Sequence, residues 1–312
     1  MSKRTARLQF ETSDERLLAS FEWAKQQALS YVFEDDPVGQ WYEAALPGRE
    51  AFCMRDVAHH AAGAQLLGLA EHTKNMLHKF AMNISPNRDW CSYWEINRWD
   101  KPASVDYLND KDFWYNLPAN FDVLYCCYRM YLWTGDSAYL EDQAFNRFYE
   151  STVTSYVQAW DKDGDGMLEH LPEYGRRGIA SYIEENIGNS DIRIGADLIA
   201  AQFAAYRAYA AILSLKNEND RSVVFAEQAR LLQQRFHHQW INPANGKYYA
   251  AMFQDMSQTD EWNNVMLGFF GIASDDRATR NLLDDITYWS YFDKVPLIEM
   301  MSYVPEVLYK YG

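Results

Sequence analysis

Apolar residues recur at helical spacing along most of the chain, whereas runs that alternate between apolar and polar residues are short and few. Thr12 and Glu15 have the spacing of a capping box, and Leu17 and Phe21 follow on one helical face. This pattern predicts a first helix at 13–33. The same periodicity predicts further helices at 50–69, 72–84, 119–134, 138–160, 191–215, 219–239, 260–271, 275–288 and 296–311. The chain is therefore expected to be all-α.

Long connections rich in Trp, Tyr, Asn, Asp, Gly and Pro separate alternate helices, at 34–49, 85–118, 161–190 and 240–259. A toroid of helical hairpins would place such connections at one end of the barrel, so we expect the functional residues there. No linker divides the chain, which predicts a single helical-hairpin domain over 1–312. An α-solenoid is the less favoured alternative, because no repeat of fixed period is visible.

Composition excludes several classes of partner. The net charge of -15 would repel a nucleic-acid backbone or an anionic membrane. No stretch has the length and purity of a membrane span, and the first residues do not form an export signal, so we expect a cytoplasmic protein, or a periplasmic or secreted one if the native start lies upstream. The cysteines show no zinc-type spacing and are expected to be buried free thiols: Cys53, Cys91, Cys126 and Cys127.

Arg55 and Asp56 lie where the second predicted helix begins. A guanidinium beside a carboxylate suits paired sugar hydroxyls, although a helix-start Asp with a solvated Arg explains the pair equally well. His59 and His60 lack the i,i+4 spacing of a metal pair, so we expect them to be packed or substrate-facing rather than zinc ligands. His60 is the one expected to bind substrate. No metal site is expected.

Aromatic residues concentrate in the connection before the fourth predicted helix. Trp94 and Trp114 offer flat surfaces for the apolar face of a sugar ring, and Tyr115 and Asn116 supply polar groups beside them. Aromatic residues that only cap the core are the alternative. We expect these four side chains to bind substrate.

The segment from Asp161 to Glu169 begins like a calcium loop, with acids at positions one, three and five and glycine at six. Position twelve, however, is Pro172, where a calcium loop needs a bidentate Glu. An acidic turn held by bonds between side chains and backbone is the favoured interpretation, and a bound cation is the alternative.

Glu184 and Glu185 form a pair of acids just before a long apolar helix. Cleaving a glycosidic bond needs one carboxylic acid to protonate the leaving oxygen and a second carboxylate to activate water or attack carbon. Adjacent side chains diverge, so only one of the two can be the acid, and its partner must come from elsewhere. A helix-capping role is the alternative.

In this order, the segments resemble the six-hairpin glycosidase superfamily of glucoamylase-like enzymes, which fold as an (α/α)6 barrel. The resemblance implies that Arg55 and Asp56 bind the terminal sugar, that Glu184 is the general acid and that Glu185 contacts substrate. It implies a catalytic base late in the chain. Twelve helices are expected and ten are predicted, so the last hairpin and the base are expected to lie beyond Gly312 unless Glu261, Asp260, Glu299 or Asp56 serves as base. Glu261 is the preferred candidate.

The sequence thus predicts a glycoside hydrolase that removes terminal sugars from an oligosaccharide without a cofactor, with inversion expected. We predict that burial raises the pKa of Glu184 and keeps it protonated near neutral pH. The sugar and linkage stay open. A barrel lyase, an epimerase using His59 and His60, and a non-catalytic carbohydrate-binding protein or truncated scaffold are the alternatives.

Overall fold

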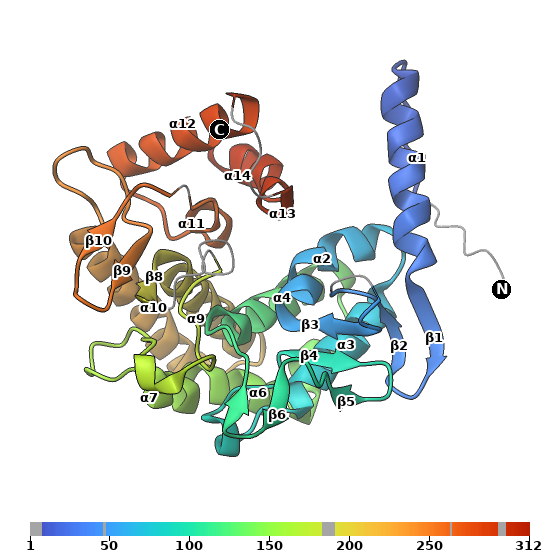
Figure 1. Ribbon diagram of the computed structural model, residues 1–312, viewed down its shortest axis with the longest axis horizontal. Coiled ribbons are helices and arrows are strands. Elements are labelled where there is room, and N and C mark those ends of the chain that lie inside the picture. The colour runs from blue at the N-terminus through green and yellow to red at the C-terminus, as the bar shows by residue number, and fades with distance from the viewer. Residues whose placement is uncertain (1–7, 46–47, 183–190, 263, 293–297) are drawn as a thin grey trace. The chain divides into compact units, whose positions relative to one another are not determined.

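A computed structural model of the chain describes residues 8–45, 48–182, 191–262, 264–292 and 298–312. The chain forms two compact units, and the elements of each are coloured by position in Figure 1. Unit 1 contains Met1–Lys111 and Cys126–Phe148, and unit 2 contains Asp112–Tyr125 and Tyr149–Gly312.

Unit 1 consists of helical hairpins with short strands in their connections. Its helices are α1 (Glu15–Ser30), α2 (Met54–Leu66), α3 (Ala70–Met82), the second part of α4 (Pro118–Thr134), α5 (Ala138–Glu141) and the start of α6 (Gln143–Ser151), with a 3-10 turn at Pro86–Arg88. Its strands are β1 (Val32–Asp36), β2 (Gly39–Tyr42), β3 (Ala51–Cys53), β4 (Glu95–Asn97), β5 (Lys101–Pro102) and β6 (Tyr107–Asn109).

The first helix is confirmed, but both of its predicted ends are corrected. Asp14, rather than Thr12, caps α1, because the Asp14 carboxylate accepts the backbone N–H groups of Arg16 at 2.9 Å and Leu17 at 3.1 Å. The helix ends at Ser30, since the next residues pair in the β1–β2 hairpin, with Val32 opposite Tyr42.

The start of the second helix is also corrected. Instead of continuing the predicted helix at 50–69, residues 51–53 form β3, which pairs antiparallel with β4 so that Cys53 lies opposite Glu95. The backbone N–H of Met54 then donates to the Trp94 carbonyl at 3.0 Å. The short sheet therefore fixes the first turn of α2 against the aromatic connection, and this places Arg55 and Asp56.

Unit 2 contains the longer helices and a second small sheet. Its helices are the first part of α4, the end of α6, a π-helical turn at Thr152–Tyr156, α7 (Val157–Trp160), α9 (Ala196–Leu215), α10 (Asn219–Gln239), α11 (Met266–Phe270), α12 (Asp276–Phe292), α13 (Ile298–Met301) and α14 (Val304–Tyr311), with a 3-10 turn at Pro172–Tyr174. Its strands are β7 (Asp112–Phe113), β8 (Ile192–Gly195), β9 (Ala251–Phe253) and β10 (Gln258–Thr259).

The α9–α10 hairpin forms the core of unit 2 (Figure 1). Helix α9 is long and apolar enough to cross a bilayer, but 78% of its most apolar window is buried inside the protein. A buried apolar helix of this kind is typical of a core. The predicted helix at 191–215 begins later than expected, because residues 192–195 form β8 and pair with β9.

Two other expectations are settled in the described residues. The helix predicted at 260–271 is corrected, since only α11 at Met266–Phe270 is helical there, and Glu261 precedes it in an irregular segment. The prediction for the cysteines is confirmed, because all four are buried free thiols.

Candidate functional site

In unit 1, Arg55 and Trp94 form a buried pair beside a partly exposed carboxylate. The guanidinium carbon of Arg55 lies 5.7 Å from the centre of the Trp94 ring, and only 8% and 7% of these two residues is exposed. Asp56 Oδ1 lies 4.0 Å from Arg55 Nε, and the Asp56 side chain is 30% exposed. We call Arg55, Asp56 and Trp94 the clamp. A cation over an aromatic face beside an accessible carboxylate offers donors, acceptors and an apolar surface together.

The thiol of Cys53 orients the Asp56 carboxylate through a hydrogen bond. Cys53 Sγ donates to Asp56 Oδ2 at 2.8 Å. Burial, and then the nearby Asp56 charge, raise the pKa of the Cys53 thiol well above its usual value, so the thiol stays protonated and acts as a donor. His60, one helical turn after Asp56, is exposed, in keeping with the predicted contact with substrate, which stays a prediction.

Across the β3–β4 pair from Cys53, Glu95 and Asp106 place two carboxyl groups against one guanidinium. Arg49 Nη1 lies 3.0 Å from Glu95 Oε2 and 3.7 Å from Asp106 Oδ2, and the Glu95 side chain is only 2% exposed. Burial, followed by the charge of Asp106, raises the pKa of Glu95 to about 7 even though Arg49 opposes the shift. Glu95 therefore keeps its proton to a higher pH than an exposed glutamate does.

Trp94 of the predicted aromatic site belongs to the clamp, and the other three members of the site differ in burial. Trp114 is half-buried, whereas Tyr115 and Asn116 are fully buried. The Tyr115 hydroxyl donates to Asn120 Oδ1 at 2.6 Å, and Asn116 Nδ2 donates to the Ser181 carbonyl at 3.0 Å. Asn116 therefore holds the backbone that leads into the acid pair, whereas the Tyr115 hydroxyl is bound to α4. Their contact with sugar stays a prediction.

Glu184 and Glu185 lie outside the described residues, but the residues that lead into them are well fixed. Tyr182 is fully buried, and its hydroxyl donates to Asp122 Oδ2 at 2.8 Å. Asp197, on the first turn of α9, accepts the Ser181 hydroxyl at 2.8 Å and the Tyr182 N–H at 2.9 Å. We call Asp122, Ser181, Tyr182 and Asp197 the acid-segment anchor.

Two of the hydrogen bonds in the anchor are accepted by the buried carboxyl group of Asp197. Burial raises the pKa of Asp197 to about 6, against the hydrogen bonds from Ser181, Tyr182 and Leu198 that lower it. Tyr182 is two residues before Glu184, so the anchor fixes the backbone from which the acid-bearing segment starts.

Replacing Tyr182 with Phe removes the hydroxyl that satisfies the buried Asp122 carboxylate. We expect Tyr182→Phe to lower the free energy of unfolding by about 1–3 kcal/mol, measured by urea denaturation. Tyr309→Phe is the matched control, because Tyr309 is 93% exposed and should change nothing measurable. Equal stability of the two variants would show that the Tyr182 to Asp122 bond does not support the anchor.

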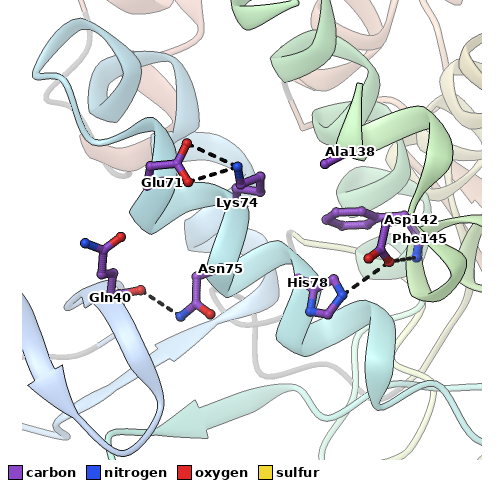
Figure 2. Close-up of a pocket in the computed structure, with 8 residues that line it drawn as sticks. All are labelled: Gln40, Glu71, Lys74, Asn75, His78, Ala138, Asp142 and Phe145. Atoms are coloured by element: carbon purple, nitrogen blue, oxygen red, sulfur yellow. Dashed lines mark hydrogen bonds and ion pairs between the residues drawn. The ribbon is translucent and has the colours of Figure 1, made fainter. Parts of the chain in front are cut away.

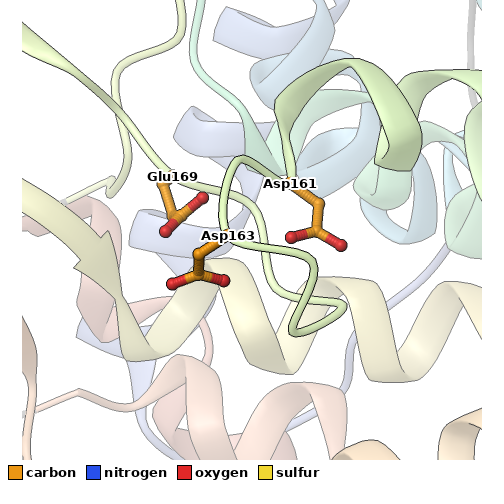
Figure 3. Close-up of side chains that lie close together, drawn as sticks. All are labelled: Asp161, Asp163 and Glu169. Atoms are coloured by element: carbon orange, nitrogen blue, oxygen red, sulfur yellow. The ribbon is translucent and has the colours of Figure 1, made fainter.

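The acidic turn of unit 2 brings together Asp161, Asp163 and Glu169, whose ligand atoms lie within 4.8 Å of one another (Figure 3). The Asp161 carboxylate accepts the backbone N–H groups of Gly164 at 2.8 Å and Gly166 at 2.9 Å. Bonds of this kind, between a side chain and the backbone, are the ones expected for an acidic turn, which is the interpretation that the sequence favoured.

A side chain from β8 already supplies positive charge to the acidic turn. Arg193 Nη2 lies 2.6 Å from Glu169 Oε1 and 3.6 Å from Asp163 Oδ2, and the backbone N–H of Lys162 donates to Glu169 Oε2 at 2.6 Å. The three carboxylates therefore stabilise a turn against β8, where Arg193 neutralises part of their charge.

The candidates for the catalytic base in unit 2 are placed as follows. Glu261 is exposed, and its backbone N–H donates to Thr259 Oγ1 at 3.3 Å. Asp260 Oδ2 accepts the side-chain amides of Asn245 at 2.7 Å and Asn242 at 2.8 Å, which lower its pKa. Glu299 is in α13, with its side chain outside the described part of the structure. Glu261 as base stays a prediction.

A cavity of about 350 Å³ in unit 1 has none of the clamp residues in its lining, which consists of Gln40, Glu71, Lys74, Asn75, His78, Ala138, Asp142 and Phe145 (Figure 2). Its charges pair with one another or with nearby groups. Lys74 Nζ lies 2.7 Å from Asp136 and 2.9 Å from Glu71, and His78 Nε2 lies 3.2 Å from Asp142. These bonds tie α3 to α5 and α6, so we assign the cavity a structural role.

Sequence reasoning missed two groups of functional interest, namely the Glu95–Asp106 pair and the Asp122 and Asp197 carboxyls. Asp122 and Asp197 each stand alone in an otherwise apolar helical segment. A solitary acid among core residues is a usable signal, because a buried carboxyl must be hydrogen-bonded. Glu95 carried no such signal, since it lies among loop residues of mixed polarity.

No family model matches the sequence, and no curated protein matches it. Solved structures do match. A GH78 family rhamnosidase of Bacillus sp. GL1 aligns with a TM-score of 0.69 and 15% identity, over 98% of this chain and 29% of that one. A rhamnosidase from Klebsiella oxytoca, solved with rhamnose bound, aligns with a TM-score of 0.64 and 12% identity, over 96% of this chain and 53% of that one.

The fold is that of the (α/α) toroids. The all-α prediction is confirmed, and the fold is shared with these two rhamnosidases. At these identities the match establishes the fold alone. The chain spans about 29% and 53% of the lengths of the two rhamnosidases.

Proposed function

We propose that the protein is a sugar-processing enzyme, and specifically a glycoside hydrolase that removes the terminal sugar from an oligosaccharide. The observation that carries the proposal is the clamp, in which a guanidinium stacked on tryptophan lies beside an accessible carboxylate, on a fold shared with two rhamnosidases. Rhamnosides are the first substrates to test, and other α-linked hexosides follow.

In the proposed mechanism Glu184 protonates the leaving oxygen, and a second carboxylate activates water. Glu261 is the preferred candidate for this base within the chain. No cofactor is required, since two carboxyl groups are sufficient for this chemistry. Inversion requires about 6.5–9.5 Å between the two carboxyl groups, which leaves room for the water.

The clamp gives the proposal a direct test. We expect Arg55→Met to raise KM for an aryl rhamnoside or aryl glucoside by about tenfold to a hundredfold, because the variant loses charged hydrogen bonds worth about 1.5–3 kcal/mol. The release of nitrophenol measures the rate. Arg230→Met is the matched control, since Arg230 is exposed and its one ion pair within the described part of the chain is with Glu227 on the same helix, at 2.5 Å.

The outcomes separate the proposed function from its rivals. A raised KM in Arg55→Met alone supports the proposal. If the two variants show the same KM, Arg55 does not bind the sugar. If the wild-type protein binds sugars in calorimetry but releases no nitrophenol from any aryl glycoside, a non-catalytic carbohydrate-binding protein is favoured instead.

A further inference from the structure

An exposed tryptophan, Trp99, lies in the turn that connects β4 to β5, at residues 98–100. Trp99 is 54% exposed, although tryptophan is a residue that usually buries most of its surface. Strand β4 starts directly after Trp94 of the clamp and ends at Asn97. The extended backbone from Trp94 to Asn97 spans about 10 Å, and the turn follows it. A sugar in contact with Trp99 would therefore be a different one from the sugar held by the clamp.

The backbone of this turn is fixed by Asn97. Its side-chain Oδ1 accepts the backbone N–H groups of Trp99 at 3.0 Å and Lys101 at 3.3 Å, and its carbonyl accepts that of Asp100 at 2.9 Å. Asp100 has a left-handed backbone, with a φ of 60°, which a non-glycine residue keeps only where its surroundings hold it there. The turn therefore presents Trp99 from a defined position.

The Trp99 ring is supported by Arg98. The guanidinium carbon of Arg98 lies over the ring, 5.9 Å from its centre, and 6.0 Å from the centre of the Phe33 ring. Asp36 Oδ1 accepts two N–H groups of Arg98, at 2.6 and 3.0 Å, and Glu50 Oε1 accepts a third at 2.6 Å. Three charged hydrogen bonds to two carboxylates hold the guanidinium plane in place. A fixed cation thus contacts the indole, while about half of Trp99 stays exposed.

Charged groups that can bind hydroxyls lie next to the exposed ring in the chain. Asp100 Oδ2 lies 2.7 Å from Lys79 Nζ of α3, and 39% of the Asp100 side chain is exposed. A flat aromatic surface can pack against the C–H groups of a sugar ring, and neighbouring polar groups can then bond its hydroxyls. The combination of a rigid tryptophan with an accessible carboxylate suits a pyranose ring.

We propose that Trp99 is a second sugar-binding surface, which contacts a pyranose ring further along the oligosaccharide whose terminal sugar the clamp binds. This inference rests on the proposed function and extends it to the length of the substrate. The exposed indole surface is buried only by a ligand long enough to reach from the clamp along β4. Affinity should therefore increase with the number of linked sugars, and a ligand with one sugar should be insensitive to Trp99.

The test compares ligands of increasing length by calorimetry of the full chain. One series is methyl α-glucoside, maltose, maltotriose and longer malto-oligosaccharides, and the second has the same lengths with a terminal α-L-rhamnose. All proteins carry Glu184→Gln, so that hydrolysis does not consume the ligand. For whichever series binds, we expect Trp99→Ala to raise the dissociation constant of the longest ligands about tenfold, or about 1.4 kcal/mol, and to leave that of the methyl glycoside unchanged.

Two further variants show whether the effect belongs to this ring. Trp99→Phe keeps a flat aromatic surface and should retain most of the gain in affinity with length. Trp133→Ala is the matched control, because Trp133 on α4 is also about half exposed, at 49%, and its removal should leave every dissociation constant unchanged. The melting temperatures of Trp99→Ala and Trp133→Ala should both equal that of the parent protein.

Kinetics without Glu184→Gln separate the Trp99 surface from the clamp. With an aryl glycoside that has a single sugar, Trp99→Ala should keep the KM of the wild type, whereas Arg55→Met should raise it. With the longest oligosaccharide that the wild type hydrolyses, Trp99→Ala should also raise KM, by about tenfold.

The outcomes distinguish this inference from the proposed function. Affinity that does not change with length, or that increases equally in Trp99→Ala, overturns the Trp99 surface while hydrolysis stands. Affinity that increases with length only when the Trp99 ring is present supports it, even if the wild type releases no monosaccharide and the hydrolase proposal fails. If no ligand of either series binds, the proposed function and the Trp99 surface are both overturned.

Discussion

Replacing Glu184 with Gln is expected to abolish turnover while leaving sugar binding and folding intact. The amide keeps the size and polarity of the side chain but cannot transfer the proton that the leaving oxygen needs. General acid catalysis contributes about 10²–10⁴-fold to rate, so kcat should fall by at least that much on a substrate with a poor leaving group. Steady-state kinetics on an oligosaccharide measures kcat, and calorimetry measures binding.

Glu185→Gln is the matched control for Glu184→Gln, because it changes the neighbouring acid by the same chemistry. The resemblance to glucoamylase-like enzymes assigns Glu185 to substrate contact, so this variant should mainly raise KM. The acid assignment is wrong if Glu184→Gln retains turnover near that of the wild type. If Glu185→Gln loses most of its kcat and Glu184→Gln changes little, Glu185 is the general acid and Glu184 the residue that contacts substrate.

Gly195→Ala is expected to have the largest effect on stability. Gly195 lies between β8 and α9, where its backbone N–H donates to the Ala180 carbonyl at 3.1 Å. An added Cβ would lie 2.6 Å from that carbonyl oxygen and 2.7 Å from Ser181 Cβ, and it would also meet Asp197 Oδ1. Overpacking of this kind costs about 1–3 kcal/mol, and here the obstruction is backbone, which cannot rotate away.

The same substitution should also lower activity, because the clash falls on the acid-segment anchor. We expect a decrease of about 2–3 kcal/mol in the free energy of unfolding, measured by urea denaturation. Gly63→Ala in α2 is the control. Nothing lies within 4 Å of the added Cβ there, so the better helix former should stabilise the protein by about 0.5–1 kcal/mol. A Gly195→Ala variant as stable as the wild type would contradict the packing described for the anchor.

The helical part of the fold could be predicted because its signal is local. In α10, predicted at 219–239 and observed at Asn219–Gln239, the periodicity extends over the whole element. The predicted starts of two helices are wrong where a short strand precedes the helix. Residues 51–53 and 192–195 are apolar enough to continue a helical pattern, and only pairing with β4 and β9, which are distant in sequence, makes them strands.

The candidate site could be predicted in part. Arg55, Asp56 and Trp94 were recognisable by residue type, and the structure brings Arg55 against both of the others. Their supports were not recognisable, because the partners of Glu95 and Tyr182 come from other elements. The preference for Glu261 depended on a helix start that is absent from this position, since a helical pattern of a few residues cannot specify where a helix begins.

The central claim is tested most directly by following an oligosaccharide with a terminal rhamnose or α-linked hexose by proton NMR during incubation with the wild-type protein. The account predicts that a free monosaccharide appears, first as the anomer opposite to that of the substrate linkage, while the remaining chain becomes one sugar shorter. A substrate whose length does not change, whether it is left intact or converted to an epimer, would contradict the assignment as a glycoside hydrolase.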